Sequence, residues 1–305
     1  MKSDILAAPK SVLLVGASDA GKSNYLYRFW LACHSRSGQL RADNLPEEMQ
    51  YLQDGVAYLN EGRFAPKTTI GSHNLVTIPV TGTVEQQDFR GVLVVPDCYG
   101  EEWMDIYRKR EWSNKWEDML HDSAGCLVFL RVDSDQNVAP LDWMTCAKYY
   151  GSAENIPDVD GTEDVPTQVV LVEWLQFLQA AFSGPHQQHR RPRFGIVITA
   201  WDLVPVEQTE SGPHAYLEAN YPLLAQFIET NCEDYDIGVF GVSIVGGDLD
   251  REPEFRKSFK AGNPDESGYV VHSLLGTPQR SLDLTLPVAW ALGLDCIPLM
   301  GEIQS

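Results

Sequence analysis

Positive charge is scarce in this sequence. Its 305 residues include 23 lysines and arginines against 43 aspartates and glutamates, which gives a formal net charge of −20 at pH 7. A chain this acidic is repelled by the phosphates of nucleic acids and by anionic lipid surfaces, although its net charge does not exclude a local basic groove. We therefore expect no nucleic-acid partner.

Cysteines and long apolar runs are also few. The six cysteines form no CxxC pair and have no histidine at zinc-ligand spacing, which argues against a zinc framework and a disulfide framework. The run LPVAWALGL at residues 286–294 is too short to span a bilayer, and the first residues lack the layout of a signal peptide. We expect a cytoplasmic protein without a transmembrane segment.

The apolar residues alternate between strand-like and helix-like patterns along the chain. Strands are expected at residues 12–15, 75–80, 91–95, 126–132, 194–199 and 239–245, and helices at 21–33, 101–120, 167–182 and 216–231. This alternation predicts an α/β fold with helices on both faces of a sheet. Residues 133–166, rich in Asp, Pro and Gly, interrupt the rhythm and are expected to form an acidic insertion.

The stretch GASDAGKS at residues 16–23 fits the phosphate-loop pattern G-x-x-x-x-G-K-[ST] in full. Gly16 and Gly21 permit the tight turn that points backbone N–H groups at phosphate oxygens. Lys22 supplies a point charge for the β- and γ-phosphates, and Ser23 supplies a hydroxyl for Mg²⁺. The expected nucleotide-binding residues here are Gly16, Ala17, Ser18, Asp19, Ala20, Gly21, Lys22, Ser23 and Asn24.

Two further segments offer the other parts of a Mg²⁺-nucleotide site. An apolar strand ends in DCYG, which places the Asp97 carboxylate on the Mg²⁺ side and the Gly100 N–H near the γ-phosphate. Before it, KTT offers Thr68 or Thr69 as a threonine that ligates the metal when γ-phosphate is present. Arg63 in the same loop is either a built-in arginine finger or an ordinary surface arginine.

Base selection is expected from the segment TAWD, which begins with Thr199 at the end of a strand. The Asp202 carboxylate can accept the N1–H and N2–H₂ donors of guanine in a bidentate pair that adenine cannot form. The alternative is an aspartate that caps a helix. Ser243 ends the last core strand, where the loop backbone can contact the guanine carbonyl edge.

The strings GASDAGKS, KTT, DCYG, TAWD and VSI follow in an order that resembles the translation-factor-like (TRAFAC) class of P-loop GTPases, which contains Ras-like proteins and G-protein α subunits. The resemblance implies a three-layer Ras-like fold whose mainly parallel sheet has one antiparallel edge strand. It also implies GTP and GDP as substrate and product, Mg²⁺ as cofactor, and Thr68 as the metal-sensing threonine.

The resemblance further implies one GTPase domain over residues 1–305, with a core at about 8–246 and a C-terminal extension at about 247–305. The insertion and the extension are not Ras-like. In layout they are similar to the bacterial double-GTPase family of conflict systems.

Two positions depart from the Ras-like pattern. Ala200 stands where the base motif N-K-x-D carries a lysine whose stem packs on the base, so Trp201 or another residue is left to stack there. Glu101 replaces a water-orienting glutamine; a glutamate repels the phosphate but can still position water. We expect slow hydrolysis without a partner. The expected catalytic residues are Lys22, Glu101 and Arg63.

Three functions fit these residues. The predicted one is a regulatory GTPase whose switch loops near Thr68 and Gly100 are read by effector or regulatory proteins, in a setting such as a bacterial conflict or defence system. The second is an ATP-using P-loop phosphotransferase or ATPase, for which the single dense arginine cluster, HRRPR, is a weak signal. The third is a degenerate nucleotide-binding scaffold with little hydrolysis, which Ala200 and Glu101 favour.

Overall fold

The computed structural model of the chain describes residues 10–35, 38–66, 75–84, 87–96, 100–111, 116, 119–120, 123–140, 165–182, 191–263, 266–274 and 277–294. The strands are β1 (Lys10–Gly16), β2 (Leu40–Ala42), β3 (Leu75–Val84), β4 (Gln87–Pro96), β5 (Ser123–Arg131), β6 (Arg193–Thr199), β7 (Asp236–Ser243), β8 (Tyr269–Leu274) and β9 (Thr277–Ser281). The helices are α1 (Lys22–Ser35), α2 (Met49–Asn60), α3 (Gly100–Lys109), α6 (Thr167–Phe182), α7 (Val206–Thr209), α8 (Gly212–Asn220), α9 (Pro222–Asn231), α10 (Pro253–Ala261) and α11 (Leu286–Ala291), with a 3₁₀ turn η2 (Trp201–Leu203).

In this part of the chain the strands form one sheet in the order β2-β3-β4-β1-β5-β6-β7-β8-β9. Strands β4, β1, β5, β6 and β7 are parallel, which confirms the predicted mainly parallel α/β sheet. The expected antiparallel strand is β3, which pairs with β4 as a hairpin. Antiparallel pairing extends further, to β2 beside β3 and to β8 and β9 beyond β7. Strand β2 has three residues and β9 is largely exposed, so these two strands carry little of the apolar signal that predicts a core strand.

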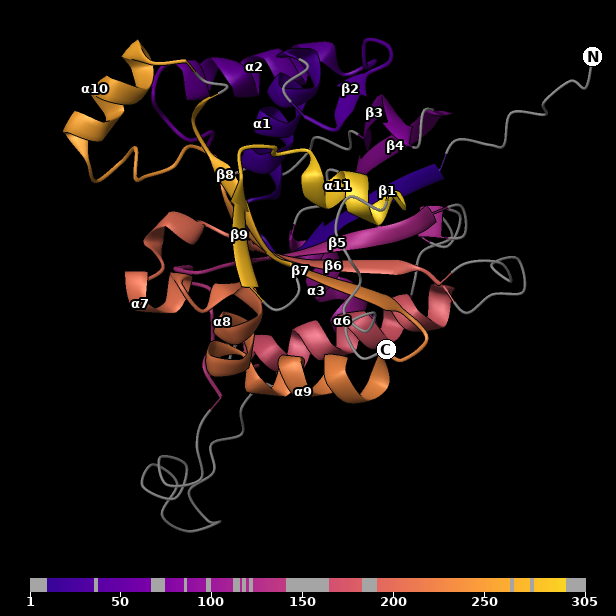
Figure 1. Cartoon of the computed structure of the whole chain (residues 1–305). Helices are drawn as coiled ribbons and strands as arrows, with labels where there is room; N and C mark the ends of the chain where they lie inside the picture. Colours follow the sequence, from indigo (N-terminus) through magenta and orange to yellow (C-terminus); the bar gives the residue numbers. More distant parts are fainter. Residues whose placement is uncertain are drawn as a thin grey trace, which may run out of the picture.

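Alternation along the strands divides the apolar side chains between two cores. On β1, Val12 and Leu14 face a core that includes α1, α2 and α11, whereas Leu13 and Val15 face a core that includes α3, α6, α8 and α9. Figure 1 shows these helices on opposite faces of the sheet. Because the central strands are covered on both faces, they need continuous apolar runs such as the one on β1.

The chain returns to the core after β7. Helix α11 is buried along its whole length and contacts β5 and β6 (Figure 1). The Tyr25 hydroxyl of α1 donates a hydrogen bond to the Leu284 oxygen at 2.9 Å, just before α11. Much of the segment expected as a C-terminal extension therefore completes the sheet and one of its two cores.

Two expected helices differ in extent from the structure. The helix expected at residues 216–231 is divided into α8 and α9, because Pro222 has no N–H to continue α8 and instead opens α9. Helix α3 ends at Lys109, where Arg110 takes a left-handed φ of +54°. Within the described residues, no helix is long and apolar enough to cross a membrane.

The acidic insertion leaves and rejoins the fold at one point. The Val138 N–H donates to Thr167 Oγ1 at 2.8 Å, and the Thr167 N–H donates to the Val138 oxygen at 3.0 Å. Thr167 begins α6, so this reciprocal pair fixes the stem of the insertion to the N-terminus of a core helix. Most of the insertion, residues 141–164, lies outside the described residues.

Candidate functional site

The phosphate loop connects the C-terminal end of β1 to the N-terminus of α1. Gly21 has a φ of +88°, a conformation that glycine adopts without strain. A Cβ atom at Gly21 would stand 2.8 Å from Thr199 Oγ1, closer than real Cβ contacts allow. The loop therefore needs glycine at this position both for its turn and for its close approach to β6. Its backbone ends at a helix N-terminus, where N–H groups and the helix dipole favour phosphate.

Lys22 and Ser23 stand at the start of α1, as the sequence predicts. Lys22 Nζ donates hydrogen bonds to the backbone oxygens of Gly16 at 2.6 Å and Ala17 at 2.7 Å, which holds the ammonium over the first residues of the loop. A glycine turn, a helix N-terminus and a fixed ammonium together fit a nucleotide polyphosphate. Among the described residues, no three His, Cys, Asp or Glu side chains gather as a metal cluster. A Mg²⁺ ion here would be held by the Ser23 hydroxyl and phosphate oxygens.

The TAWD segment presents its residues in different directions. Thr199 Oγ1 donates to the Ala20 oxygen at 2.9 Å and lies 3.3 Å from the Leu130 oxygen, so it ties the phosphate loop to β6 and β5. Ala200 takes a left-handed φ of +56°, and after this turn Asp202 lines a cavity beside the loop. Trp201 is fully buried and packs edge-on against Tyr216. Trp201 is therefore excluded as the residue that replaces the lysine on the base, because its ring belongs to the core.

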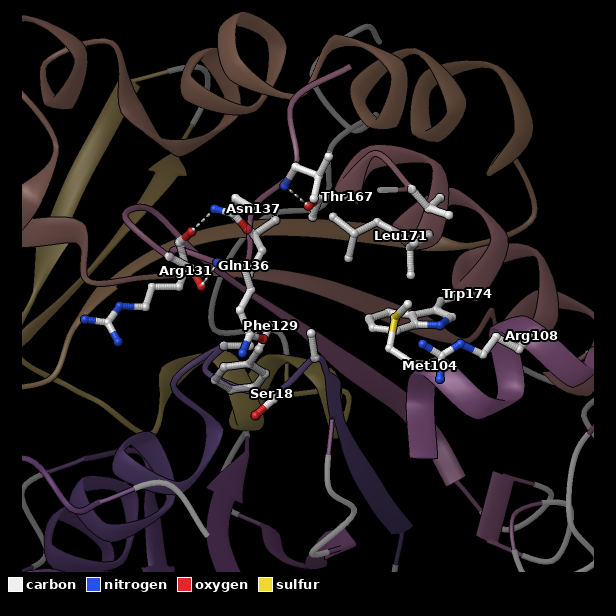
Figure 2. A pocket seen from close by; sticks show the side chains of 17 residues that line it. Ser18, Met104, Arg108, Phe129, Arg131, Gln136, Asn137, Thr167, Leu171 and Trp174 are labelled. Atoms are coloured by element: carbon white, nitrogen blue, oxygen red, sulfur yellow. Dashed lines mark hydrogen bonds between the residues drawn. The ribbon is translucent and has the colours of Figure 1, made fainter. Parts of the chain in front are cut away.

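Two cavities flank the phosphate loop. The smaller one, about 210 Å³, lies between the loop, the turn after β6 and the turn after β7, and it is lined by Gly21, Asp202 and Ile244 among others. The larger one, about 380 Å³, lies between the loop, β5, α3 and α6. In Figure 2, Met104 and Trp174 line the α3–α6 side of the larger cavity. The Asp202 carboxylate belongs to the smaller cavity, so that cavity is the expected place for a base.

The turn after β7 is shaped by Ser243 and by an arginine that sequence reasoning missed. Ser243 is fully buried, and its Oγ accepts a hydrogen bond from the Gly246 N–H at 2.9 Å, so it supports the turn from behind. The turn itself lines the smaller cavity with Ile244 and Val245. Arg28 of α1, 3% exposed, donates from Nε to the Ile244 oxygen at 2.8 Å. The sequence signal for Arg28 is a lone arginine among the apolar residues of α1.

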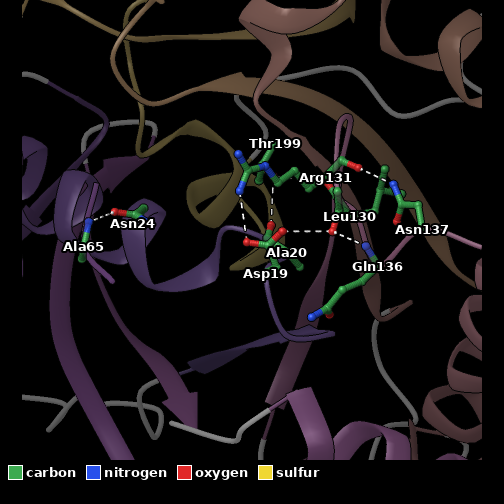
Figure 3. A network of polar contacts seen from close by, with 10 residues as sticks. Asp19, Ala20, Asn24, Ala65, Leu130, Arg131, Gln136, Asn137 and Thr199 are labelled. Carbon is green, nitrogen blue, oxygen red and sulfur yellow. Dashed lines mark hydrogen bonds and ion pairs between the residues drawn. The ribbon is translucent and has the colours of Figure 1, made fainter. Parts of the chain in front are cut away.

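Asn24 and Arg63 differ in their place relative to the site, because Asn24 lines the smaller cavity and Arg63 does not. The Asn24 side-chain oxygen accepts a hydrogen bond from the Ala65 N–H at 3.0 Å, which ties α1 to the segment that follows α2 (Figure 3). Arg63 has a side chain that is 57% exposed, and it pairs with Glu61 and lies over the Tyr58 ring. Arg63 lines neither of the two cavities.

Four expected roles cannot be placed in this geometry. Thr68 and Asp97 lie outside the described residues. Gly100 and Glu101 form the first residues of α3, and the Glu101 side chain is outside what the structure describes. Their roles stay predictions.

Arg131 at the end of β5 is a second residue that sequence reasoning missed. Its Nη1 lies 3.1 Å from Asp19 Oδ1 in the phosphate loop (Figure 3), and its side chain lines both cavities. Ser134 Oγ donates to the other Asp19 oxygen, Oδ2, at 3.0 Å. An arginine at the end of an apolar strand is a visible signal, but its partner stands 112 residues away in the sequence.

The Asp202 carboxylate acts electrostatically on Tyr269 of β8. Burial raises the pKa of Tyr269, and the Asp202 carboxylate raises it further, whereas Arg280 lowers it. The Arg280 guanidinium lies 3.7 Å from the centre of the Tyr269 ring. The Asp202 carboxylate therefore lies close enough to β8 to act on Tyr269.

A family model described as Double-GTPase 1 matches residues 13–291. Solved structures similar to the chain include the signal recognition particle receptor SRb-GTP/SRX complex from Chaetomium thermophilum, with 16% identity and a TM-score of 0.36, covering 83% of this chain and 98% of that one. Another is the S. cerevisiae Ski7 GTPase-like domain bound to GTP, with 8% identity and a TM-score of 0.38, covering 77% of this chain and 42% of that one. None of the curated protein sequences matches the chain.

Proposed function

Because the chain belongs to the Double-GTPase 1 family, we propose that it binds GTP and GDP at the phosphate loop and hydrolyses GTP as a regulatory switch. The observation that carries this proposal is the position of Asp202. The Thr199 hydroxyl ties the end of β6 to the phosphate loop, and three residues later Asp202 lines the cavity beside that loop. A phosphate site and a guanine-accepting carboxylate are thereby held by one framework.

The residues of the site divide the tasks of binding and hydrolysis in this proposal. The loop N–H groups and Lys22 hold the phosphates, and Asp202 accepts two guanine donors. Mg²⁺, when bound, supplies positive charge to the phosphates at Ser23. For hydrolysis, we assign the positioning of the attacking water to Glu101. Thr68 and Asp97 are assigned to contacts with Mg²⁺.

Partner proteins are proposed to read the nucleotide through the two segments that adjoin the site. Asn24 is bonded to Ala65, shortly before Thr68, and α3 starts at Gly100. A change at the γ-phosphate therefore has a short route to both segments. By the resemblance in layout, such a switch acts in the cytoplasm on effector proteins of a bacterial conflict system.

A nucleotide-binding scaffold with little hydrolysis is the second candidate. One observation favours it: the expected arginine finger, Arg63, is turned toward Glu61 and the Tyr58 ring and lines neither cavity. Without an arginine finger at the transferred phosphate, hydrolysis is slow unless a partner supplies one.

Calorimetric titration and single-turnover hydrolysis test both candidates. The wild-type protein is expected to bind GDP and GTP and to discriminate against ATP. Lys22→Ala is expected to weaken GDP binding at least 100-fold, whereas Lys109→Ala, which removes an exposed lysine paired with Asp105, serves as the matched control and leaves binding unchanged. Equal affinity for ATP, or normal binding by Lys22→Ala, contradicts the proposal. GTP binding without turnover selects the scaffold.

A further inference from the structure

We propose that Arg131 is a positioning residue that neutralises Asp19 and turns its carboxylate away from the nucleotide, which allows an acidic phosphate loop to hold a diphosphate. This inference rests on the proposed function, because it assigns a role to residues of the same site. It concerns the fourth position of the loop GASDAGKS, where the chain places a negative charge next to the expected phosphates.

The charges around the smaller cavity make such compensation necessary. The cavity is lined by four aspartates, Asp19, Asp202, Asp248 and Asp250, but by only two arginines, Arg131 and Arg251. The whole chain carries a formal charge of −20, so no general positive field offsets these carboxylates. Of the four, Asp19 is the one that belongs to the phosphate loop itself.

The geometry engages both oxygens of the Asp19 carboxylate. Oδ1 faces Arg131 Nη1 at 3.1 Å (Figure 3). Oδ2 accepts a hydrogen bond from Ser134 Oγ at 3.0 Å. Asp19 has a left-handed φ of +64°, which aspartate tolerates better than most residues. The carboxylate is thus held toward β5 and the segment that follows it.

Arg131 is well placed to hold this position. It pairs across the sheet with Thr199, the residue whose hydroxyl bonds to Ala20 of the same loop. Its side chain is 34% exposed and lines both cavities, so its charge reaches the phosphate side of the site as well as Asp19.

A double-mutant cycle separates compensation from direct contact. GDP affinity is measured by calorimetry for the wild type, Arg131→Ala, Asp19→Asn and the double variant, at about 0.1 M and 0.5 M salt. Arg131→Ala is expected to weaken GDP binding at least tenfold at low salt and less at high salt, because the exposed repulsion is screened. If Arg131 acts by neutralising Asp19, Arg131→Ala is expected to weaken GDP binding less than threefold when it is made in the Asp19→Asn background.

The control is Arg110→Ala, which removes an arginine paired with Glu173 at 2.8 Å and lining neither cavity. Circular dichroism establishes that each variant is folded. If the double variant is as weak as Arg131→Ala, or if Arg131→Ala binds like the wild type, the compensating role is overturned. A wild type that binds no GDP contradicts the proposed function itself. If the wild type binds GDP but the effects of the two single substitutions on GDP affinity add up in the double variant, only the compensating role of Arg131 is contradicted.

Discussion

The hydroxyl of Thr199 donates a hydrogen bond to the backbone oxygen of Ala20 over 2.9 Å, and both residues are 5% exposed. This bond joins the end of β6 to the phosphate loop across 179 residues of sequence. Because a buried carbonyl without a partner destabilises the fold, the two segments are held at a fixed separation. Removing this bond therefore tests whether it holds the phosphate loop against β6.

Thr199→Val keeps the shape of the side chain and removes its hydroxyl. The Ala20 oxygen loses its buried donor, which costs about 1–3 kcal/mol. The free energy of unfolding, the free energy of GDP binding, or both should therefore fall by at least about 1 kcal/mol. Thr199→Ser retains the hydroxyl and is the matched control. Calorimetry and urea unfolding measure the two effects. A valine variant equal to the wild type in both would show that the bond holds nothing in place.

Asp202→Asn tests base recognition. An asparagine cannot accept both guanine donors, so GDP binding should weaken by about 10- to 100-fold, in line with the 1.5–3 kcal/mol of a charged hydrogen bond. Xanthosine diphosphate should bind the variant more tightly than the wild type. Asp250→Asn changes another carboxylate on the same cavity and should leave this preference unaltered. Loss of both nucleotides to the same degree would argue against a base contact.

Gly21→Ala is expected to suffer both a backbone penalty and a steric clash, whereas the same substitution at Gly246 suffers the backbone penalty alone. Gly21 has a φ of +88°, and its added methyl group would stand 2.8 Å from Thr199 Oγ1. Gly246 has a φ of +90°, but the nearest atom to its added methyl group would be the Gly268 nitrogen at 3.6 Å. Gly246→Ala should therefore cost about 1–2 kcal/mol from backbone conformation alone. Gly21→Ala should cost more and abolish GDP binding, which thermal unfolding and titration would detect.

His272 on β8 is expected to make the protein less stable at acidic pH. Burial lowers its pKa below the ordinary value of 6.5, despite a backbone hydrogen bond that favours the charged form. Below pH 6.5 the unfolded chain takes up a proton that the folded chain resists, so stability falls as pH drops toward the lowered pKa. Above pH 6.5 this residue contributes no pH dependence. His272→Gln should flatten the melting temperature between pH 6.5 and 5 relative to the wild type; an unchanged slope would assign the acid sensitivity elsewhere.

The central strands and the phosphate loop could be predicted because their signals are local. Residues 12–15 form a continuous apolar run, and the glycines and lysine of the loop follow at fixed spacing. The last two strands, β8 and β9, could not be predicted in this way. Their stability comes from pairing with a strand already in the sheet, and β9 presents mainly exposed residues. Pro222 was a readable signal for the break between α8 and α9.

The site was predicted less completely because its remaining parts depend on distant contacts. The sequence shows an acidic residue at position 19 and an arginine at position 131, but only the fold brings them to 3.1 Å. Trp201 is the opposite case. Its place in the base motif suggests a stacking role, whereas the left-handed turn at Ala200 leaves its ring in the core against Tyr216.

The reciprocal hydrogen bonds between Val138 and Thr167 have a consequence for the evolution of this chain. They close the stem at one point, so the sheet is largely insensitive to the length of the chain between them. Doubling such a loop costs only about 0.6 kcal/mol in closure entropy. Relatives with the same core can therefore exchange this stretch for a sequence of another length without redesigning the fold that carries it.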